Sequence, residues 1–558
     1  MPTMNRFCGE CGSRLEGGEQ FCGQCGSAVT SKIDPSGEDI GQRTEPGRST
    51  VSDWLRGLWR TGKGAEPAGM KQAQKGLLLT NSALLSESGL DGRKLATSFI
   101  DARFRDQSTG WHLLDAADEL GTDAGVDDYL QFIEEYCGLL VKDDSETVPL
   151  LIFGDHSVVP MALIEDKADS GNDGDVDSDL PYVLLESDGI WDKVLEKFEP
   201  RMDVGRIPVG SHFGADQLEA YLAACREVRA KGGGSSVFGL SAKCWEGASL
   251  SVHKSLIVEG MSPDLLLSPD VEVDTLEEHG DLSSNWLYFN VHGSDRDKHW
   301  FGQEGGDYPR ACAPEFFRQT QGWNIVGVEA CYGARFIGFD PEDSALLTAL
   351  ASKTVAFAGA SRIAYGPPDP PNQLADLVIR DFLKSAMEGH TVGDAMNHGR
   401  AAMLAEDNWD SDILAKSIME FNLFGDPLLR VGTYRKDIPR RPINKPYYAG
   451  SGIPRTESLG QMDGRFLGQI RTMTEANASR MRESLSALLS KRYPDMKSVV
   501  PDVSRIRIPP GSKSKGVTEV IKVHYKAPSF GRDRKEVVAY CDTGGVVKRV
   551  LESKNRSR

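Results

Sequence analysis

The chain contains 558 residues, enough for about three to four domains. Its 39% hydrophobic and 26% charged residues are typical of a soluble globular protein, and the formal net charge of −18 argues against a general nucleic-acid binder. It contains no apolar run of about 18 residues, so we expect no transmembrane helix. The N-terminal segment MPTMNRFCGECG lacks the apolar stretch of a secretory signal. Ten scattered or clustered cysteines do not resemble a disulfide framework, so we expect a cytoplasmic protein.

Residues 1–29 contain two copies of a short cysteine motif, FCGxCG. Cys8-x-x-Cys11 and Cys22-x-x-Cys25 are separated by ten residues, and their glycines allow tight turns in which backbone amides face the sulfurs. Four thiolates at this spacing predict a closed tetrahedral zinc site, and the segment resembles a short rubredoxin-like zinc ribbon. Such a site is structural or presents a binding surface. Two redox-active dithiol pairs are the weaker alternative.

The next segments predict a linker followed by a large α/β domain. Residues 30–75 are rich in Ser, Gly, Pro and charge, and include the short amphipathic stretch VSDWLRGLWR. Over residues 76–435, apolar runs alternate with amphipathic stretches, which predicts a mostly parallel sheet flanked by helices, in halves of about 76–232 and 235–435. The runs expected to be strands are VPLLIFGD (148–155), SSVFGLSA (235–242), NWLYFNVHG (285–293), WNIVGVEA (323–330) and KTVAFAGAS (353–361).

Residues 436–558 predict a basic C-terminal α+β domain. A Pro/Gly-rich stretch precedes a helical pattern over 477–493, and Gly544-Gly545 suits a hairpin turn. From residue 441 onward there are 24 basic and 11 acidic residues, a net charge of +13, so the preceding 440 residues carry −31. The domain could dock on the acidic body and restrain it, be a solvated domain, or bind nucleic acid, although no stacking motif is evident.

Two polar residues follow two consecutive apolar runs of the α/β region. His292 ends the run NWLYFNVHGS, and Cys331 ends WNIVGVEACYGA. The carboxyl ends of neighbouring parallel strands line one crevice, so we expect the two side chains to lie side by side there. An imidazole beside a thiol favours the thiolate and can protonate a leaving amine. A buried structural cysteine and a core histidine are the alternative.

These motifs resemble the caspase-like (clan CD) cysteine peptidases, in which His-Gly-Ser follows one strand and Glu-Ala-Cys-x-Gly the next. Further segments are similar to the gingipain-like (C25) family, and the resemblance covers about residues 76–435. Those segments are PLLIFGDHSVVP (149–160), SDLPYVLLESDG (178–189), MDVGRIPVGS (202–211) and FNLFGDPLLR (421–430).

The resemblance implies roles for individual residues. His292 takes the place of the general base and acid, Cys331 that of the nucleophile, and the amides of Gly293 and Cys331 form the oxyanion hole. Asp179 falls where arginine-selective relatives place the acid of the S1 pocket, and Glu329 could add charge to that pocket. Both acids favour a basic P1 residue, Arg above Lys. Two alternatives stay open: Asp179 is an ordinary acidic loop residue, and Glu329 orients the backbone.

The departures from the gingipain-like pattern predict regulation. Gingipains are secreted and lose a pro-segment, whereas an N-terminal zinc ribbon suggests an enzyme that acts inside its own cell. We expect such an enzyme to be a zymogen, held inactive until an activating protease or a partner protein switches it on. Antiviral defence is one expected setting. Ca²⁺, used by some relatives, is compatible with the acidic loop 165–179, which is not an EF-hand. The alternative functions are a catalytically silent scaffold that binds proteins through ribbon and tail, and a zinc-ribbon nucleic-acid regulator. We expect no membrane partner, and nucleic acid only through the basic domain.

Overall fold

The computed structural model describes most of the chain from residue 74 onward. The described residues are 74–107, 109–137, 147–168, 174–231, 234, 236–257, 265–406, 409–431, 454–462, 473–509, 517–526 and 535–554, with the backbone of 6–7 and 14–15. The chain divides into two compact units, Met1–Gly64 and Ala65–Arg558. In the first unit, β1 (Arg6–Phe7) pairs antiparallel with β2 (Arg14–Leu15). The expected zinc ligands Cys8, Cys11, Cys22 and Cys25 and most of the expected linker lie outside the described residues.

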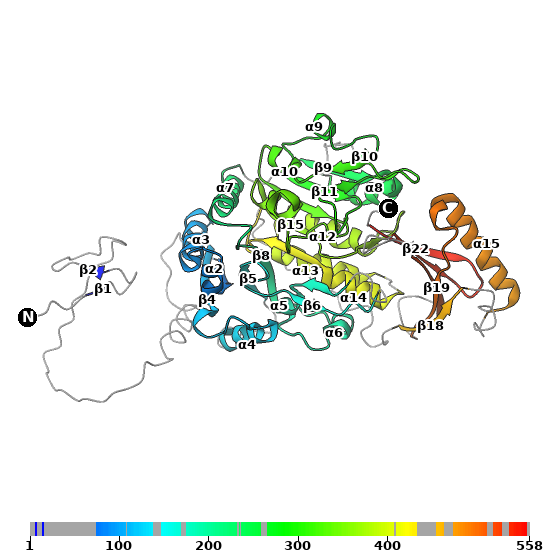
Figure 1. The fold of residues 1–558 in the computed structure, drawn as a ribbon, viewed down its shortest axis with the longest axis horizontal. Coiled ribbons are helices and arrows are strands. Elements are labelled where there is room, and N and C mark those ends of the chain that lie inside the picture. The colour runs from blue at the N-terminus through cyan, green and yellow to red at the C-terminus, as the bar shows by residue number, and fades with distance from the viewer. Residues whose placement is uncertain are drawn as a thin grey trace, which may run out of the picture. The chain divides into compact units, whose positions relative to one another are not determined.

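The second unit is built around a ten-stranded sheet with helices on its faces (Figure 1). In spatial order its strands are β10 (Leu266–Ser268), β9 (Val237–Ala242), β11 (Trp286–Asn290), β14 (Asn324–Val328), β15 (Thr354–Ala360), β17 (Phe421–Gly425), β8 (Met202–Ile207), β5 (Val148–Phe153), β3 (Gln74–Thr80) and β4 (Thr109–Asp115). Eight of the nine neighbouring pairs are parallel, and only β15 and β17 run antiparallel. The expected halves therefore share one continuous sheet, joined where β17 pairs with β8.

The helices of this part connect the strands. They are α2 (Ser82–Glu87), α3 (Gly92–Gln107), α4 (Val126–Cys137), α5 (Leu180–Leu184), α6 (Ile190–Glu196), α7 (Ala215–Lys231), α8 (Glu246–Leu256), α9 (Leu276–His279), α10 (Phe316–Gln319), α11 (Ala345–Leu350), α12 (Ala375–Met387), α13 (Val392–Ala405) and α14 (Ser411–Glu420). Two short hairpins add β6 (Ala162–Ile164) with β7 (Val176–Ser178), and β12 (Trp300–Phe301) with β13 (Arg310–Cys312). Among the described residues, no helix combines the length and apolar character that crossing a membrane requires.

The five runs expected to be strands are strands, each shorter at one or both ends. Every residue of β11, β14 and β15 is buried, which explains why these segments are continuous apolar runs and not alternating ones. The residues trimmed from β11 and β14 include His292 and Glu329, which lie just beyond the strand ends. The α/β fold with a mostly parallel sheet is therefore confirmed.

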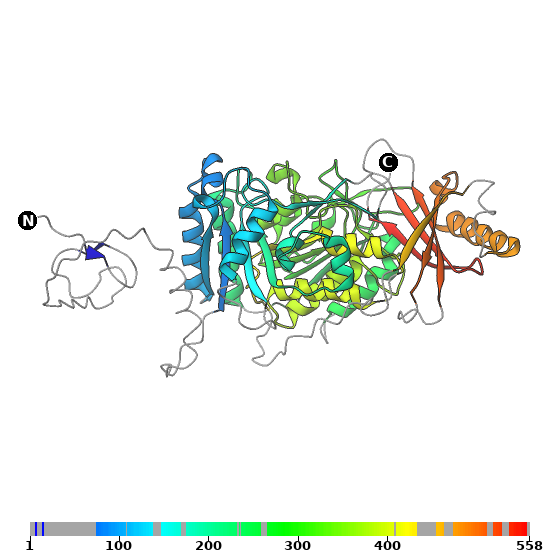
Figure 2. The same cartoon turned by 90° about the horizontal axis from the view of Figure 1, so that it is seen from below.

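The C-terminal part forms an antiparallel sheet that begins on a strand of the α/β part. Its order is β16 (Tyr365–Gly366), β22 (Val547–Ser553), β21 (Glu536–Cys541), β20 (Glu519–Lys526), β19 (Asp502–Arg507) and β18 (Arg455–Gln461). The helix α15 (Glu475–Arg492) lies against this sheet (Figure 2), and its Met481, Leu485 and Leu489 are buried in the shared core. The expected helix and the expected turn at Gly544-Gly545, where Gly545 has φ +82°, are both present.

Candidate active site

The sheet places His292 and Cys331 at adjacent strand ends. The parallel strands β11 and β14 pair so that Phe289 lies opposite Val328. His292 lies two residues past the end of β11 and Cys331 three residues past the end of β14, so both follow neighbouring strands at the same edge of the sheet. Gly293 approaches so closely that a Cβ atom there would lie 1.7 Å from the Cys331 carbonyl oxygen, so only glycine fits. Both His292 and Cys331 are fully buried.

A tight turn after the nucleophile candidate fixes the thiol. Tyr332 adopts a left-handed conformation with φ 54°, which is uncommon for a bulky residue, and its N–H donates to the Arg362 carbonyl at 2.9 Å. The Sγ atom of Cys331 accepts from the Ala364 N–H at 3.2 Å. The turn therefore holds the sulfur against the backbone that enters β16.

The ring of His292 is oriented by Gln303. The Gln303 amide nitrogen donates to the Gly305 carbonyl at 2.8 Å, so its Oε1 atom is the one that faces His292 Nε2, at 2.9 Å. Because an amide oxygen only accepts, this contact puts a proton on Nε2, and the basic nitrogen of the neutral ring is then Nδ1. Trp245 and Tyr308 pack on the same ring, with centroids 4.2 and 5.1 Å away.

Two backbone amides converge on one carbonyl oxygen at this site. The N–H groups of Gly293 and Cys331 both donate to the backbone oxygen of Lys554, at 2.9 and 3.2 Å. The Lys554 N–H donates in turn to the Ala364 carbonyl at 2.9 Å. Two fixed amides on a carbonyl oxygen beside a thiol are the arrangement that stabilises the tetrahedral intermediate of acyl transfer.

The C-terminal strand β22 pairs with β16, the short strand that follows the Cys331 contact Ala364. In the antiparallel pair of β22 and β16, Ser553 lies opposite Tyr365 and Glu552 opposite Gly366. Peptide ligands commonly bind sheet edges in this way, with main-chain hydrogen bonds for affinity and side-chain pockets for specificity. Residues 552–554, which we call the tail strand, contact residues 364–366 through their main chain in this way.

The side chain of Lys554 fills a buried acidic pocket. Its Nζ atom donates to Asn290 Oδ1 at 2.7 Å and to Asp376 Oδ1 at 3.1 Å, and it also contacts Glu329 Oε2. The ring of Trp245 lies 5.1 Å from the ammonium and adds a cation–π contact. All three acceptor residues and Lys554 are fully buried. The ammonium of Lys554 is therefore enclosed by three buried acceptor side chains and one aromatic ring.

The ammonium of Lys554 and the two carboxylates favour each other's charged forms, whereas the two carboxylates disfavour each other's. Burial alone would lower the pKa of Lys554, but the charges of Glu329 and Asp376 outweigh it and the pKa is raised, so Lys554 stays a cation. Burial, together with the neighbouring Asp376 carboxylate, raises the pKa of Glu329 well above its usual range, while Lys554 acts in the opposite direction. Asn372 donates to Asp376 Oδ2 at 2.9 Å and orients that carboxylate. Two acids enclosed together strongly favour a cation between them.

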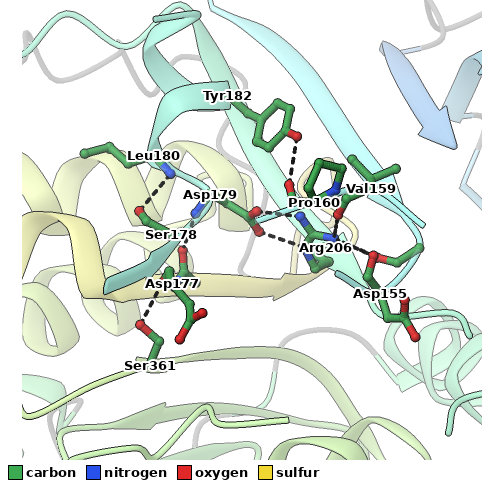
Figure 3. Close-up of polar contacts among 12 residues, drawn as sticks. Asp155, Val159, Pro160, Asp177, Ser178, Asp179, Leu180, Tyr182, Arg206 and Ser361 are labelled. Carbon is green, nitrogen blue, oxygen red and sulfur yellow. Dashed lines mark hydrogen bonds and ion pairs between the residues drawn. The ribbon is translucent and has the colours of Figure 1, made fainter. Parts of the chain in front are cut away.

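Asp179, the other acid expected at the S1 pocket, has a different partner. Arg206 holds its two carboxylate oxygens bidentately, at 2.6 and 2.9 Å (Figure 3), and both side chains are buried. The Arg206 guanidinium also donates to the carbonyls of Gly154 and Val159, both at 2.8 Å. This pair ties β8 to the loop after β5. The structure does not bring Asp179 to the acids around Lys554, so its S1 role stays a prediction.

One group of described residues has the donor set for a metal ion. His390, Asp394 and His398 offer ligand atoms within 4.8 Å of one another, and His390 Nδ1 lies 2.7 Å from Asp394 Oδ2. His390 lies just before α13 and the other two residues lie within it, and none of them is among the contacts of His292, Cys331 or Lys554 described above. The expected calcium at the acidic loop 165–179 stays a prediction.

Comparison with known proteins supports a peptidase. Residues 315–432 match the family described as Peptidase family C25. This segment contains Cys331, Glu329 and Asp376 but begins after His292. A solved structure described as "Structure of Protease" aligns with 87% of this chain and 97% of its own, with 12% identity and a TM-score of 0.43. No curated protein matches the chain.

Four residues that contact His292 or line the acidic pocket were not expected from the sequence: Asn290, Gln303, Asp376 and Lys554. Asn290 alone had a local signal, because it lies two positions before His292 and so on the same face of the strand. Asp376 and Lys554 lie 178 residues apart in the chain and meet only through the tertiary fold.

Proposed function

We propose that the protein is a cysteine endopeptidase that cleaves proteins after lysine, with Cys331 as nucleophile and His292 as general base and acid. The observation that carries this proposal is the position of Lys554. Its carbonyl oxygen receives the amides of Gly293 and Cys331, while its ammonium occupies an acidic pocket. A peptide residue bound in this way occupies the P1 position of a substrate.

The first chemical step is acylation. The Cys331 sulfur attacks the P1 carbonyl carbon after His292 accepts the thiol proton, and the negative charge that develops on the carbonyl oxygen is held by the two amides. The C–N bond then breaks, and the His292 imidazolium gives its proton to the leaving amine. Gln303 keeps the imidazole ring oriented through both proton transfers and is a positioning residue.

Deacylation reverses the roles. A water molecule attacks the thioester carbonyl while His292 takes its proton, and the same two amides again hold the oxyanion. The bond to sulfur breaks, the thiol is restored, and the product leaves with a new carboxylate. Substrate main chain is held beside Ala364 and Tyr365, as the tail strand is.

We propose that the pocket prefers lysine at P1, whereas the sequence resemblance implies a preference for arginine above lysine. The pocket offers Asn290, Glu329 and Asp376 to a single nitrogen atom, which suits a compact ammonium. A guanidinium is planar and prefers a bidentate carboxylate, and Asp179, the acid proposed for that purpose, already holds Arg206 in this way.

A fluorogenic panel with Lys, Arg, Asp and Asn at P1 tests the proposal. The Lys554→Ala chain is used, so that the pocket is empty of its own lysine, beside Lys554→Ala carrying Cys331→Ala. We expect Cys331-dependent cleavage with Lys preferred. If no substrate is cleaved in a Cys331-dependent way, even after limited proteolysis, the catalytically silent scaffold becomes the better explanation.

We further propose that the basic C-terminal domain holds the enzyme latent. Its basic residues pair with acids of the α/β part: Lys522 Nζ lies 2.5 Å from Asp410 Oδ2, and Arg492 contacts Asp369. Tyr540 OH donates to the same Asp410 oxygen at 3.0 Å. These contacts support docking of the +13 segment on the acidic body, and they hold the tail strand in the cleft. An activating protease or partner protein would release it.

The remaining proposals concern the N-terminal cysteines and the setting. We propose that Cys8, Cys11, Cys22 and Cys25 bind one structural Zn²⁺ and that the ribbon recruits protein partners of a cytoplasmic enzyme. Elemental analysis of the purified chain should give one zinc per molecule, and Cys8→Ser with Cys22→Ser should lose it. Retention of full zinc content in that double variant would contradict this ligand set and direct attention to the His390 cluster.

A further inference from the structure

The last described residue makes every contact that the proposed reaction asks of a P1 residue. The carbonyl oxygen of Lys554 receives two amides, its N–H donates to Ala364, and its ammonium reaches Glu329. These contacts come from three places: the amides of Gly293 and Cys331, the backbone of Ala364 just before β16, and the acidic pocket. A tail that only covered the site would need one of these contacts, and the coincidence of all three holds the Lys554 carbonyl, the group that the nucleophile attacks, by the amide of Cys331.

We propose that the chain cleaves its own Lys554–Asn555 peptide bond, removing the four residues Asn555–Arg558, and that the tail strand then stays in the cleft as bound product. The inference rests on the proposed function, because it uses the same Cys331 nucleophile. It goes beyond that function by assigning a self-processing site and the state in which the processed chain is left.

The reaction balances as a hydrolysis. The Cys331 sulfur forms a thioester with the Lys554 carbonyl carbon, the C–N bond to Asn555 breaks, and the amine of Asn555 takes its proton through His292. Water is the co-reactant of the second step. Its oxygen becomes part of the Lys554 carboxylate, and its protons return to His292 and the thiol. One water molecule is consumed, and no oxidant or reductant is needed.

The product has reason to remain where it forms. The strand β22, which ends one residue before Lys554, pairs with β21, with Glu552 opposite Val537 and Leu551 opposite Val538. Cleavage after Lys554 leaves this ladder intact, so the new terminus is tethered at a high effective concentration. The new carboxylate oxygen can accept from the same two amides as the carbonyl did, with a charge-assisted hydrogen bond. Processing by itself therefore leaves the cleft occupied.

The same strand supplies a matched control. Lys548 lies on β22 itself, but its side chain is 47% exposed and pairs with Asp542 at 3.1 Å, outside the acidic pocket. Lys548→Ala and Lys554→Ala remove the same charge, the first from within β22 and the second from the residue directly after it. Only the second removes the group that fills the pocket.

Intact-mass spectrometry of the purified full-length chain is the test. We expect the wild type and Lys548→Ala to lack Asn555–Arg558 and to end in Lys554, and Cys331→Ala and Lys554→Ala to keep all 558 residues. Expression in medium containing ¹⁸O-water should place the heavy oxygen in the Lys554 carboxylate. A wild-type chain that retains Asn555–Arg558, or a Cys331→Ala chain that loses them equally, would overturn the inference.

A second measurement separates this inference from the proposed function. The Lys554→Ala chain is assayed on a fluorogenic lysine peptide in parallel. Cys331-dependent peptide cleavage together with an unprocessed wild type would overturn self-processing alone, whereas no peptide cleavage and no processing would overturn both. Because the tail strand occupies its own cleft, we expect cleavage within one molecule: Cys331→Ala chain mixed with active Lys554→Ala chain should stay intact, and its efficient trimming would contradict this geometry.

Discussion

The sharpest prediction concerns the acidic pocket that holds the ammonium of Lys554. Glu329→Gln keeps the shape of the side chain but removes one of the two carboxylates around a fully buried ammonium. A hydrogen bond to a charged group contributes about 1.5–3 kcal/mol, and each ~1.4 kcal/mol is a factor of ten in rate. We therefore expect kcat/KM for a lysine substrate to fall by about 10- to 150-fold.

The assay compares a P1 lysine peptide with its norleucine counterpart, which fills the pocket without the charge. It uses the Lys554→Ala background, so that the pocket is free for substrate. Cleavage of the norleucine peptide should change by less than about twofold in Glu329→Gln, since that substrate makes no ion pair. Glu342→Gln, at an acid whose side chain is 63% exposed, is the matched control and should leave both rates unchanged. An unchanged lysine-to-norleucine ratio in Glu329→Gln would refute the assignment of the pocket.

Three further predictions test the positioning and the latency of the site. Gln303→Ala should lower kcat about tenfold with KM unchanged, because it removes a hydrogen bond of about 1.5 kcal/mol from the imidazole; Gln303→Glu, which keeps an accepting oxygen, should restore much of the loss, and a change confined to KM would contradict a positioning role. Asp410→Asn removes the carboxylate that faces the buried ammonium of Lys522, so docking of the C-terminal domain should weaken by about 3 kcal/mol. The C-terminal domain should then be proteolysed faster, and peptidase activity should rise. Equal protease resistance in the variant and the wild type would contradict the docking. Latency should stay constant between about pH 6 and 9, because the pKa of Lys554 is raised in the folded chain. Its ammonium is fully charged below the ordinary lysine pKa, and its ion pairs are lost only as the pH rises through the raised pKa. A steep gain of activity across this pH range would contradict this prediction.

The sequence was sufficient for the α/β fold and for the position of His292 and Cys331 just past the ends of two neighbouring strands. Both follow from local rules: continuous apolar runs mark strands buried on both faces, and the carboxyl ends of parallel strands meet at one edge of a sheet. The C-terminal helix and its turn were equally local, as the periodicity around Leu485 and the glycine at position 545 show.

Glu329 was expected at an acidic pocket from its motif, but Asp376 and Lys554 could not be predicted to join it, because they meet it only through long-range packing. Lys554 is one of 24 basic residues in the C-terminal segment, and Glu329 lies 225 positions before it. Asp179 illustrates the opposite case, since its motif suggested a pocket acid but its carboxylate is bound by Arg206 from the neighbouring strand β8. A motif can therefore indicate that a titratable residue is buried or polar, but its role can be assigned only from the group that it contacts in the fold.

The most direct test of the account is covalent trapping of the nucleophile. The Lys554→Ala chain is treated with a lysine acyloxymethyl ketone probe, beside the matching aspartate probe, and the site of labelling is mapped by peptide mass spectrometry. The account predicts a single adduct on Cys331 with the lysine probe, little with the aspartate probe, and a loss of labelling in Glu329→Gln. Labelling of Cys331 to the same extent by both probes, or no labelling of Cys331 at all, would contradict a lysine-directed cysteine peptidase.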